Sequence, residues 1–162
     1  MNEKTVSESE SEMSRLVLPE DTNSFGNLYG GRLVEWMDNI ASITAFKHAR
    51  SKVVTGSIDS LFFLSPVKLG YIVNIHSRIT YVTRSTMEVE ITVKSENVET
   101  AENKITTRAY FTYVAIDDSG HSIEIPGLKI QGPDEERRYH EGELRNKMRI
   151  ELLEEARKNL NK

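Results

Sequence analysis

The sequence of 162 residues has no cysteine, four prolines and no long apolar run. Without cysteine, disulfides and thiolate-bound metal ions are excluded. A membrane-spanning helix needs about 18 or more consecutive apolar residues, and no such stretch occurs. The acidic, Ser-rich beginning also lacks the pattern of a secretory signal. We therefore expect a cytoplasmic protein that does not bind a membrane.

An excess of positive charge is also missing, since the formal net charge is −4. The chain as a whole has no electrostatic reason to bind nucleic acid, although a local basic patch can still receive an anionic ligand. A hydrophobic fraction of 38% over this length suits one domain with a sizeable core. No metal site is predicted, because the four histidines lie far apart with no i,i+4 pair: His48, His76, His121 and His140.

What the sequence does contain is a strongly apolar helical stretch at residues 30–46, around which we expect the chain to fold. At 100° per residue its apolar residues fill well over half of the circumference, so protein should cover this helix on most sides. The remaining polar stripe consists of Arg32, Glu35, Asp38, Asn39 and Ser42. Asp38 lies at the edge of that stripe beside small apolar residues, which makes its carboxylate a candidate for the border of a pocket.

The same helix begins with Gly30 and Gly31. The first N–H groups of a helix lack intrahelical partners and carry the positive end of the helix dipole. A polarised carbonyl oxygen or a phosphate can dock against such donors. The two glycines are equally compatible with a tight loop or close packing.

The rest of the chain reads mainly as strands joined by short turns. Alternating or apolar segments predict strands at residues 15–18, 53–64, 71–81, 87–94 and 105–116. In the segment 87–94 the apolar residues alternate with Glu88, Glu90, Thr92 and Lys94, which should form a polar face. The connections at 83–85 and 98–103 are short enough for hairpins, so the sheet should be largely antiparallel. One long helix against such a sheet is an α+β fold. Since one sheet cannot enclose so apolar a helix, self-association is expected.

Composition divides the chain into three segments. Residues 1–14 are Ser- and Glu-rich and are expected to be disordered. Residues 15–132 contain the helix and the strands, and we expect them to form the domain. Residues 133–162 predict a charged helical tail with a narrow apolar stripe.

Nine short segments, taken in order, resemble one known family. They lie at residues 19–23, 26, 30–31, 36–38, 53–55, 63, 66–67, 85–89 and 111–115. Together they resemble the hotdog-fold acyl-CoA thioesterases, in the branch that hydrolyses acyl-CoA broadly. The resemblance implies a long central helix wrapped by an antiparallel sheet, with an additional C-terminal helix. It also implies a homo-oligomer, either a dimer or a trimer of dimers, that hydrolyses acyl-CoA to free fatty acid and coenzyme A.

The resemblance assigns the reacting groups residue by residue. Asn23 and Asp38 match the catalytic pair of the family, whose members face each other across a subunit boundary. Asp38 would act as general base on a water or attack the thioester itself, and Asn23 would orient the water or the carbonyl. Gly30 and Gly31 would offer backbone N–H groups to the developing oxyanion. Asp38 lies seven residues beyond Gly31, about 10 Å along a helix, so a site shared between two subunits fits this assignment.

Coenzyme A is part of the substrate and product, and no other cofactor is expected. Its phosphates need cations near the pocket mouth, and the turn of Arg84, Ser85 and Thr86 matches a basic turn of the family, with Thr83 in place of the usual glycine. Thr55 matches a family threonine near the substrate. The alternatives are a solvated hairpin for the turn and a purely structural role for Thr55.

Two other functions remain open at this point. The first is a hotdog hydratase or dehydratase, which typically relies on a histidine with an acidic partner at the helix. The only histidine on the predicted helix is His48, near its far end. The second is a non-catalytic module that binds acyl-CoA or regulates another protein.

Overall fold

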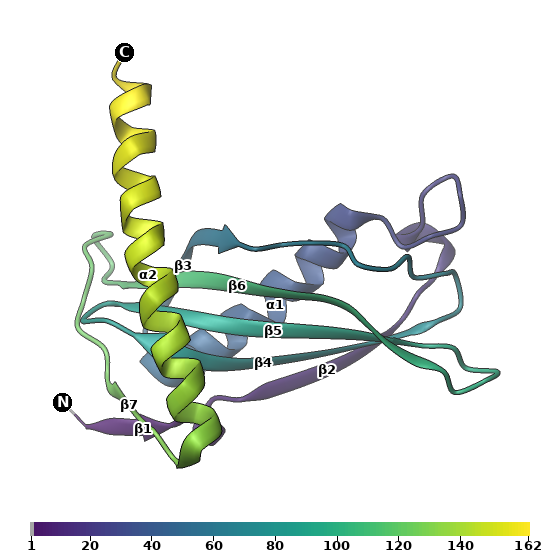
Figure 1. Cartoon of the computed structure of the whole chain (residues 1–162), viewed down its shortest axis with the longest axis horizontal. Coiled ribbons are helices and arrows are strands. Elements are labelled where there is room, and N and C mark those ends of the chain that lie inside the picture. The colour runs from purple at the N-terminus through teal and green to yellow at the C-terminus, as the bar shows by residue number, and fades with distance from the viewer. Residues whose placement is uncertain (1) are drawn as a thin grey trace.

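The apolar stretch forms helix α1, Gly30–Ala49, in a computed structural model that describes residues 2–162 (Figure 1). Its N-cap, Tyr29, has extended backbone angles. The helix ends at Arg50, which adopts the left-handed conformation with φ of 52° and donates its N–H to the carbonyl of Phe46. No helix among the described residues has both the length and the apolar character needed to cross a bilayer.

Five strands form the main sheet. They are β2 (Ser11–Leu16), β3 (Lys52–Asp59), β4 (Ile72–Val82), β5 (Thr86–Glu96) and β6 (Asn103–Ile116). Their spatial order is β2-β4-β5-β6-β3, and each pair of neighbours is antiparallel. Helix α1 lies against one face and contacts all five strands, whereas α2 (Gly132–Leu160) crosses the other face (Figure 1). This is the expected α+β arrangement of a long helix wrapped by an antiparallel sheet.

The core lies between α1 and the sheet. Met37, Ala41 and Ala45 of the helix are fully buried, as are Val89 and Phe111 of the central strands. Burying one such large apolar side chain contributes about 1.5–3 kcal/mol. These contacts fix which face of α1 is inward, and they leave Asp38 at the border of the buried surface.

The N-terminal segment differs from the disordered one expected over 1–14. β1 (Glu3–Thr5) pairs in parallel with β7 (Gly127–Lys129), a 3₁₀ turn follows at Val6–Glu8, and β2 pairs with β4. Val6 is buried, and Lys47 Nζ donates to Ser11 Oγ over 3.1 Å. Backbone pairing to an exposed sheet edge holds this segment, and a polar composition does not reveal such pairing.

β3 also differs from its expected extent. It ends at Asp59 instead of near residue 64, and Ser60 has a φ of 55° that turns the chain out of the sheet. Residues 60–66 therefore form a loop that carries Phe63 toward the start of α1.

Helix α2 attaches to the sheet mainly through ion pairs. Glu88 of β5, which the alternating pattern placed on a polar face, is buried beneath it. Arg145 and Arg149 each approach a carboxylate oxygen of Glu88 to 2.8 Å, and Arg149 also reaches Asp59. Tyr139 of the expected apolar stripe packs against Tyr81, but most of the stripe faces outward instead, with Leu152 67% exposed. Removing one partner of such a buried pair typically costs about 3–5 kcal/mol.

Helix α2 lies close against the sheet at Gly142, which generates a prediction. A Cβ at this position would lie 2.7 Å from Tyr81 Cβ and 3.0 Å from Glu88 Oε1. Because the Cβ of Tyr81 is fixed to its backbone, Gly142→Ala should push α2 outward and lower the free energy of unfolding by about 1–3 kcal/mol. Chemical denaturation measures this difference, with the exposed Lys147→Ala as the control within about 0.5 kcal/mol. Unchanged stability of Gly142→Ala would contradict this packing.

Candidate active site

Asp38 lies where α1 meets β3 and β6, and two hydroxyl groups converge on one of its oxygens. Thr55 Oγ1 donates to Asp38 Oδ1 over 2.9 Å, and the Tyr113 hydroxyl donates to the same atom over 2.7 Å. Tyr113 also reaches the main-chain oxygen of Asp38 at 3.3 Å. No hydrogen bond joins Oδ2 to any residue in the range 2–162. The carboxylate is therefore anchored at one oxygen and open at the other.

Tyr113 was not predicted as a site residue, although it lies in one of the family motifs. In the sequence it is one of several large residues in a central strand, which predicts only a core position. Its side chain is 1% exposed. A buried tyrosine hydroxyl usually finds a hydrogen-bond partner. A tyrosine predicted in the core could therefore have suggested a contact with a polar residue of the helix. Burial, together with the hydrogen bond to Asp38, raises the pKa of Tyr113 above its ordinary value, so the hydroxyl keeps its proton.

Asn23 lies in the loop that leads into α1, and the oxygen of its side-chain amide already accepts hydrogen bonds within that loop. Its Oδ1 accepts the N–H groups of Phe25 and Asn27 over 3.0 and 3.1 Å. These two backbone donors fix which atom of the amide is oxygen. The Asn23 amide nitrogen makes no hydrogen bond to the described part of the chain. Asn23 can therefore donate to a ligand but has little capacity to accept from one.

A cavity of about 350 Å³ brings Asn23 together with the start of α1. Gly30, Phe63 and Thr106 also line it. A Cβ on Gly30 would lie 3.1 Å from Phe63 Cζ, so the aromatic ring lies close against this glycine. The N–H groups of Gly30 and Gly31 have no backbone acceptor among residues 2–162. Gly31 is exposed and does not line the cavity.

Asp38 is not part of the lining of this cavity. It follows Gly30 by eight residues, about 12 Å along the helix axis. Within one chain, the structure brings Asp38 together with Thr55 and separately brings Asn23 together with Gly30. The chain thus carries two separate groups of predicted site residues, one with a carboxylate and one with hydrogen-bond donors.

The predicted phosphate-binding turn lies at the same end of the sheet as the carboxylate. The carbonyl of Ser85 accepts the N–H of Ala115, two residues beyond Tyr113 on β6. Thr86 is occupied within the turn, because its hydroxyl lies 2.6 Å from that of Thr83. Arg84 is exposed, and Nη2 donates to Ser122 Oγ over 3.2 Å. Of the three predicted residues, Arg84 is the one that offers a charge to a ligand.

Known proteins similar to this chain share one family. A model of the thioesterase superfamily matches residues 25–102. A Bacillus subtilis protein named an uncharacterized acyl-CoA thioester hydrolase is 37% identical over 119 residues, 74% of this chain and 69% of that protein. The chain belongs to the thioesterase superfamily.

Two further relatives describe how far the similarity extends. The human cytosolic acyl coenzyme A thioester hydrolase is 34% identical over 143 residues, which are 87% of this thioesterase-superfamily chain and 38% of that protein. The chain thus spans less than half the length of that relative. An acyl-CoA hydrolase of Staphylococcus aureus, solved with butyryl coenzyme A, coenzyme A and coenzyme A disulfide, has a TM-score of 0.91 at 34% identity, over 98% of this chain and 96% of that one. The predicted hotdog fold is confirmed.

His48 is the histidine on which a hydratase or dehydratase would depend in this thioesterase-superfamily chain. It is buried near the end of α1, and Nε2 lies 2.8 Å from the carbonyl oxygen of Pro126. Burial lowers the pKa of His48, although the contact to Pro126 acts in the opposite direction. It does not line the cavity at Asn23, and it makes no hydrogen bond to the Asp38 carboxylate. Among residues 2–162, no group of three or more histidine, cysteine or acidic side chains is arranged to hold a metal ion.

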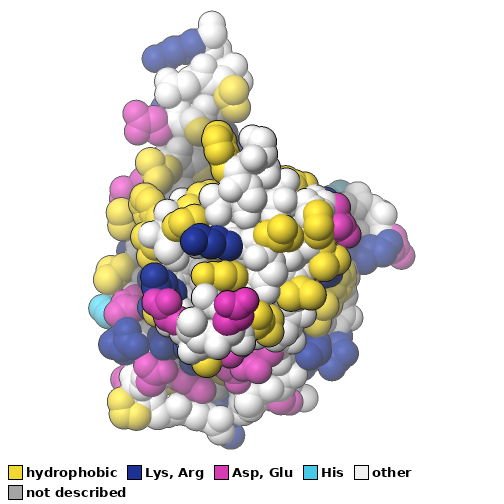
Figure 2. All heavy atoms as spheres, turned by 90° about the vertical axis from the view of Figure 1, so that its right-hand side faces the viewer, with side chains coloured by type: hydrophobic (Ala, Val, Ile, Leu, Met, Phe, Trp, Pro, Cys, Tyr) yellow, Lys and Arg dark blue, Asp and Glu magenta, His cyan; other side chains and the backbone are white. Residues whose placement is uncertain are grey.

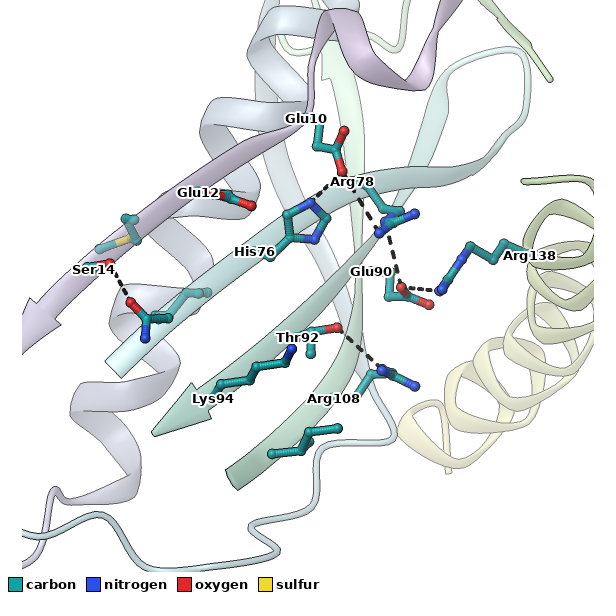
Figure 3. A pocket seen from close by; sticks show the side chains of 14 residues that line it. Glu10, Glu12, Ser14, His76, Arg78, Glu90, Thr92, Lys94, Arg108 and Arg138 are labelled. Atoms are coloured by element: carbon teal, nitrogen blue, oxygen red, sulfur yellow. Dashed lines mark hydrogen bonds and ion pairs between the residues drawn. The ribbon is translucent and has the colours of Figure 1, made fainter. Parts of the chain in front are cut away.

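A larger cavity, about 620 Å³, lies on the face of the sheet that α2 crosses (Figure 3). Charged side chains line it, and they largely pair with one another: His76 with Glu10, and Arg138 with Glu90. None of the residues predicted for catalysis or for binding coenzyme A lines this cavity. The candidate active site of this superfamily member is therefore on the α1 face of the sheet.

Proposed function

We propose that this chain hydrolyses the thioester of acyl-CoA to a free fatty acid and coenzyme A, in a site shared between two subunits. The observation that carries the proposal is the Asp38 carboxylate, held at Oδ1 by Thr55 and Tyr113 and open at Oδ2. In the Staphylococcus aureus hydrolase, alanine variants of an asparagine, an aspartate and a threonine have been solved, and these residues are spaced by 15 and then 17 positions. Asn23, Asp38 and Thr55 have the same spacing.

The chemistry needs few groups because a thiolate leaves readily. Asp38 Oδ2 takes a proton from a water, whose oxygen adds to the thioester carbonyl carbon. The developing oxyanion accepts hydrogen bonds from the N–H groups at the start of α1, and Asn23 donates to the carbonyl oxygen. The tetrahedral intermediate then expels the thiolate of coenzyme A, which receives the proton. A positioned base contributes roughly 10²–10⁴ in rate, and one oxyanion donor about 10²–10³.

A second copy of the chain completes the site by placing its Asp38 against the donors of the first. Strand β3 is an edge strand that pairs only with β6 within residues 2–162, and Val54 and Ile58 are exposed on it. Apolar side chains also gather on the end of the molecule formed by the loops before α1 and after β3 (Figures 1 and 2), where Phe25 is 85% exposed. Such uncovered apolar surface favours association.

Related enzymes support the assembly and the location that we propose. Solved relatives include an acyl-CoA thioesterase described as apo-hexameric and a hexameric thioesterase of Yersinia pestis. We extend this to a homodimer that assembles further into a trimer of dimers. Arg84, in the turn with Ser85 and Thr86, makes the phosphate contact at the mouth of each site. The protein acts in the cytoplasm.

One assay tests both the hydrolysis of acyl-CoA and the role of Asp38 as the general base. Acyl-CoA with a thiol-trapping dye should give thiol release from the unmodified protein, whereas hydration of an enoyl-CoA would indicate the lyase and binding without reaction would indicate a non-catalytic module. Asp38→Asn should lower kcat by about 10²–10⁴-fold with little change in KM, because it removes the base but not the binding surface.

The matched control for this loss is Glu35→Gln on the same helix. Glu35 is exposed and pairs with Arg32, so its replacement should leave kcat within about twofold. Retention of most activity by Asp38→Asn would remove Asp38 from the mechanism.

Sharing of the site between subunits is tested by mixing two inactive variants. Asn23→Ala and Asp38→Asn each impair both sites of their own dimer, but a hybrid dimer has one doubly altered site and one intact site. Equal mixing with subunit exchange should restore about a quarter of the unmodified activity, because half of the dimers are hybrids with one active site each. Mixing two tagged preparations of Asp38→Asn is the control. No recovery in the mixed sample would indicate that both residues act within one chain.

The phosphate contact generates a separate prediction. Arg84→Ala should raise KM for acyl-CoA by roughly 2- to 10-fold at low ionic strength with kcat nearly unchanged, because an exposed guanidinium contributes binding but no chemistry. Steady-state kinetics at two salt concentrations measure the effect, and Arg137→Ala on the exposed side of α2 is the control. An unchanged KM would place the phosphate contact elsewhere.

A further inference from the structure

We infer that Tyr113 is a positioning residue for the proposed hydrolysis: together with Thr55 it holds Asp38 Oδ1, so that only Oδ2 is available to the substrate. The inference rests on the proposed function and adds a residue to it. Tyr113 is separated from the substrate by the carboxylate that it binds.

The hydrogen bonds of Tyr113 fix both the side chain and the backbone of Asp38. Its hydroxyl lies 2.7 Å from Oδ1 and 3.3 Å from the main-chain oxygen of the same residue. A carboxylate bound by one donor can still swing about its last torsion, which is broad. With Thr55 as a second donor at 2.9 Å, Oδ1 is held from two strands at once. The orientation of the carboxylate is then fixed, and so is the direction in which Oδ2 points.

Of the two donors, Tyr113 has the more rigid support. It lies on β6, between Met87 of β5 and Thr55 of β3 in the sheet register. Its side chain is fully buried in the core, so its rotamer is locked by packing. Thr55 instead lies on the edge strand, is exposed, and adjoins an irregularity between Thr55 and Ser57. The position of Asp38 therefore depends mainly on the tyrosine.

Packing alone does not require a hydroxyl at position 113. A phenylalanine fills nearly the same volume, as Phe111 does two residues earlier on the same face. Burying a hydroxyl without a partner is unfavourable, and Asp38 provides the acceptor at 2.7 Å that makes the Tyr113 hydroxyl compatible with the core. Burial and that same bond raise the pKa of Tyr113 and keep it a donor at neutral pH.

The test removes the hydroxyl without removing the ring. Tyr113→Phe should lower kcat by about 10- to 100-fold, the range expected for a lost hydrogen bond to a charged group, with KM within about twofold. Tyr110→Phe is the matched control, because Tyr110 lies on the same strand and donates to Glu90 over 3.1 Å on the opposite face. It should leave kcat within about twofold.

Rescue separates a positioning role from a packing role. Replacing Tyr113 by 4-aminophenylalanine keeps an uncharged donor at the same place, and it should recover most of the lost kcat. Thr55→Val, on the edge strand, should lower kcat less than Tyr113→Phe does, and the double variant should lose more than the product of the two single losses. Circular dichroism and thermal midpoints confirm that each variant is folded.

The outcomes distinguish this inference from the proposed function. If the unmodified protein releases thiol but Tyr113→Phe has the same kcat, the inference is overturned and the function stands. Equal losses in Tyr113→Phe and Tyr110→Phe, or no rescue by the amino analogue, would also overturn it. If the unmodified protein releases no thiol, the proposed function fails and the positioning role fails with it.

Discussion

The packing of α1 against one face of the five-stranded sheet is the constraint on which the rest of the molecule depends. It decides which helix residues are buried, and it places Asp38 at the border between the core and the open side. A carboxylate fully inside the core would pay a large desolvation cost, and one fully in water would have no fixed direction. At the border it keeps access to a ligand while hydroxyl groups from the sheet fix its orientation.

In the proposed mechanism one chain supplies only part of each active site, and the packing of α1 gives the reason. A helix rises about 1.5 Å per residue, so a donor group at its first residue and a base eight residues later cannot meet at one carbonyl. A two-fold relation between identical chains solves the problem without a new element, because each helix start can face the middle of the other helix. In this arrangement the active site would form only when two chains associate.

The sequence predicted the elements that are set by apolar periodicity and missed those set by polar contacts. α1 and the three central strands follow directly from the spacing of residues such as Met37 and Phe111. β1 and the first residues of β2 were missed, because these Ser- and Glu-rich residues are held by backbone pairing, whereas the strand predicted at 15–18 overlaps the end of β2. Glu88 was expected on a polar face, because the arginines that bury it lie 57 and 61 positions further along the chain. For the site, the family motifs supplied Asn23 and Asp38, but only the three-dimensional structure links Tyr113 to Asp38.

The attachment of α2 through Glu88 has a consequence for engineering. The ion pairs of Glu88 require both arginines at fixed positions along α2. Arg145 and Arg149 therefore fix the position of α2 on the sheet through Glu88. Transfer of the helix to a related domain without Glu88 would lose these contacts. A working chimera has to carry Glu88 and both arginines together, with a glycine at position 142, where a Cβ would lie 2.7 Å from Tyr81 Cβ.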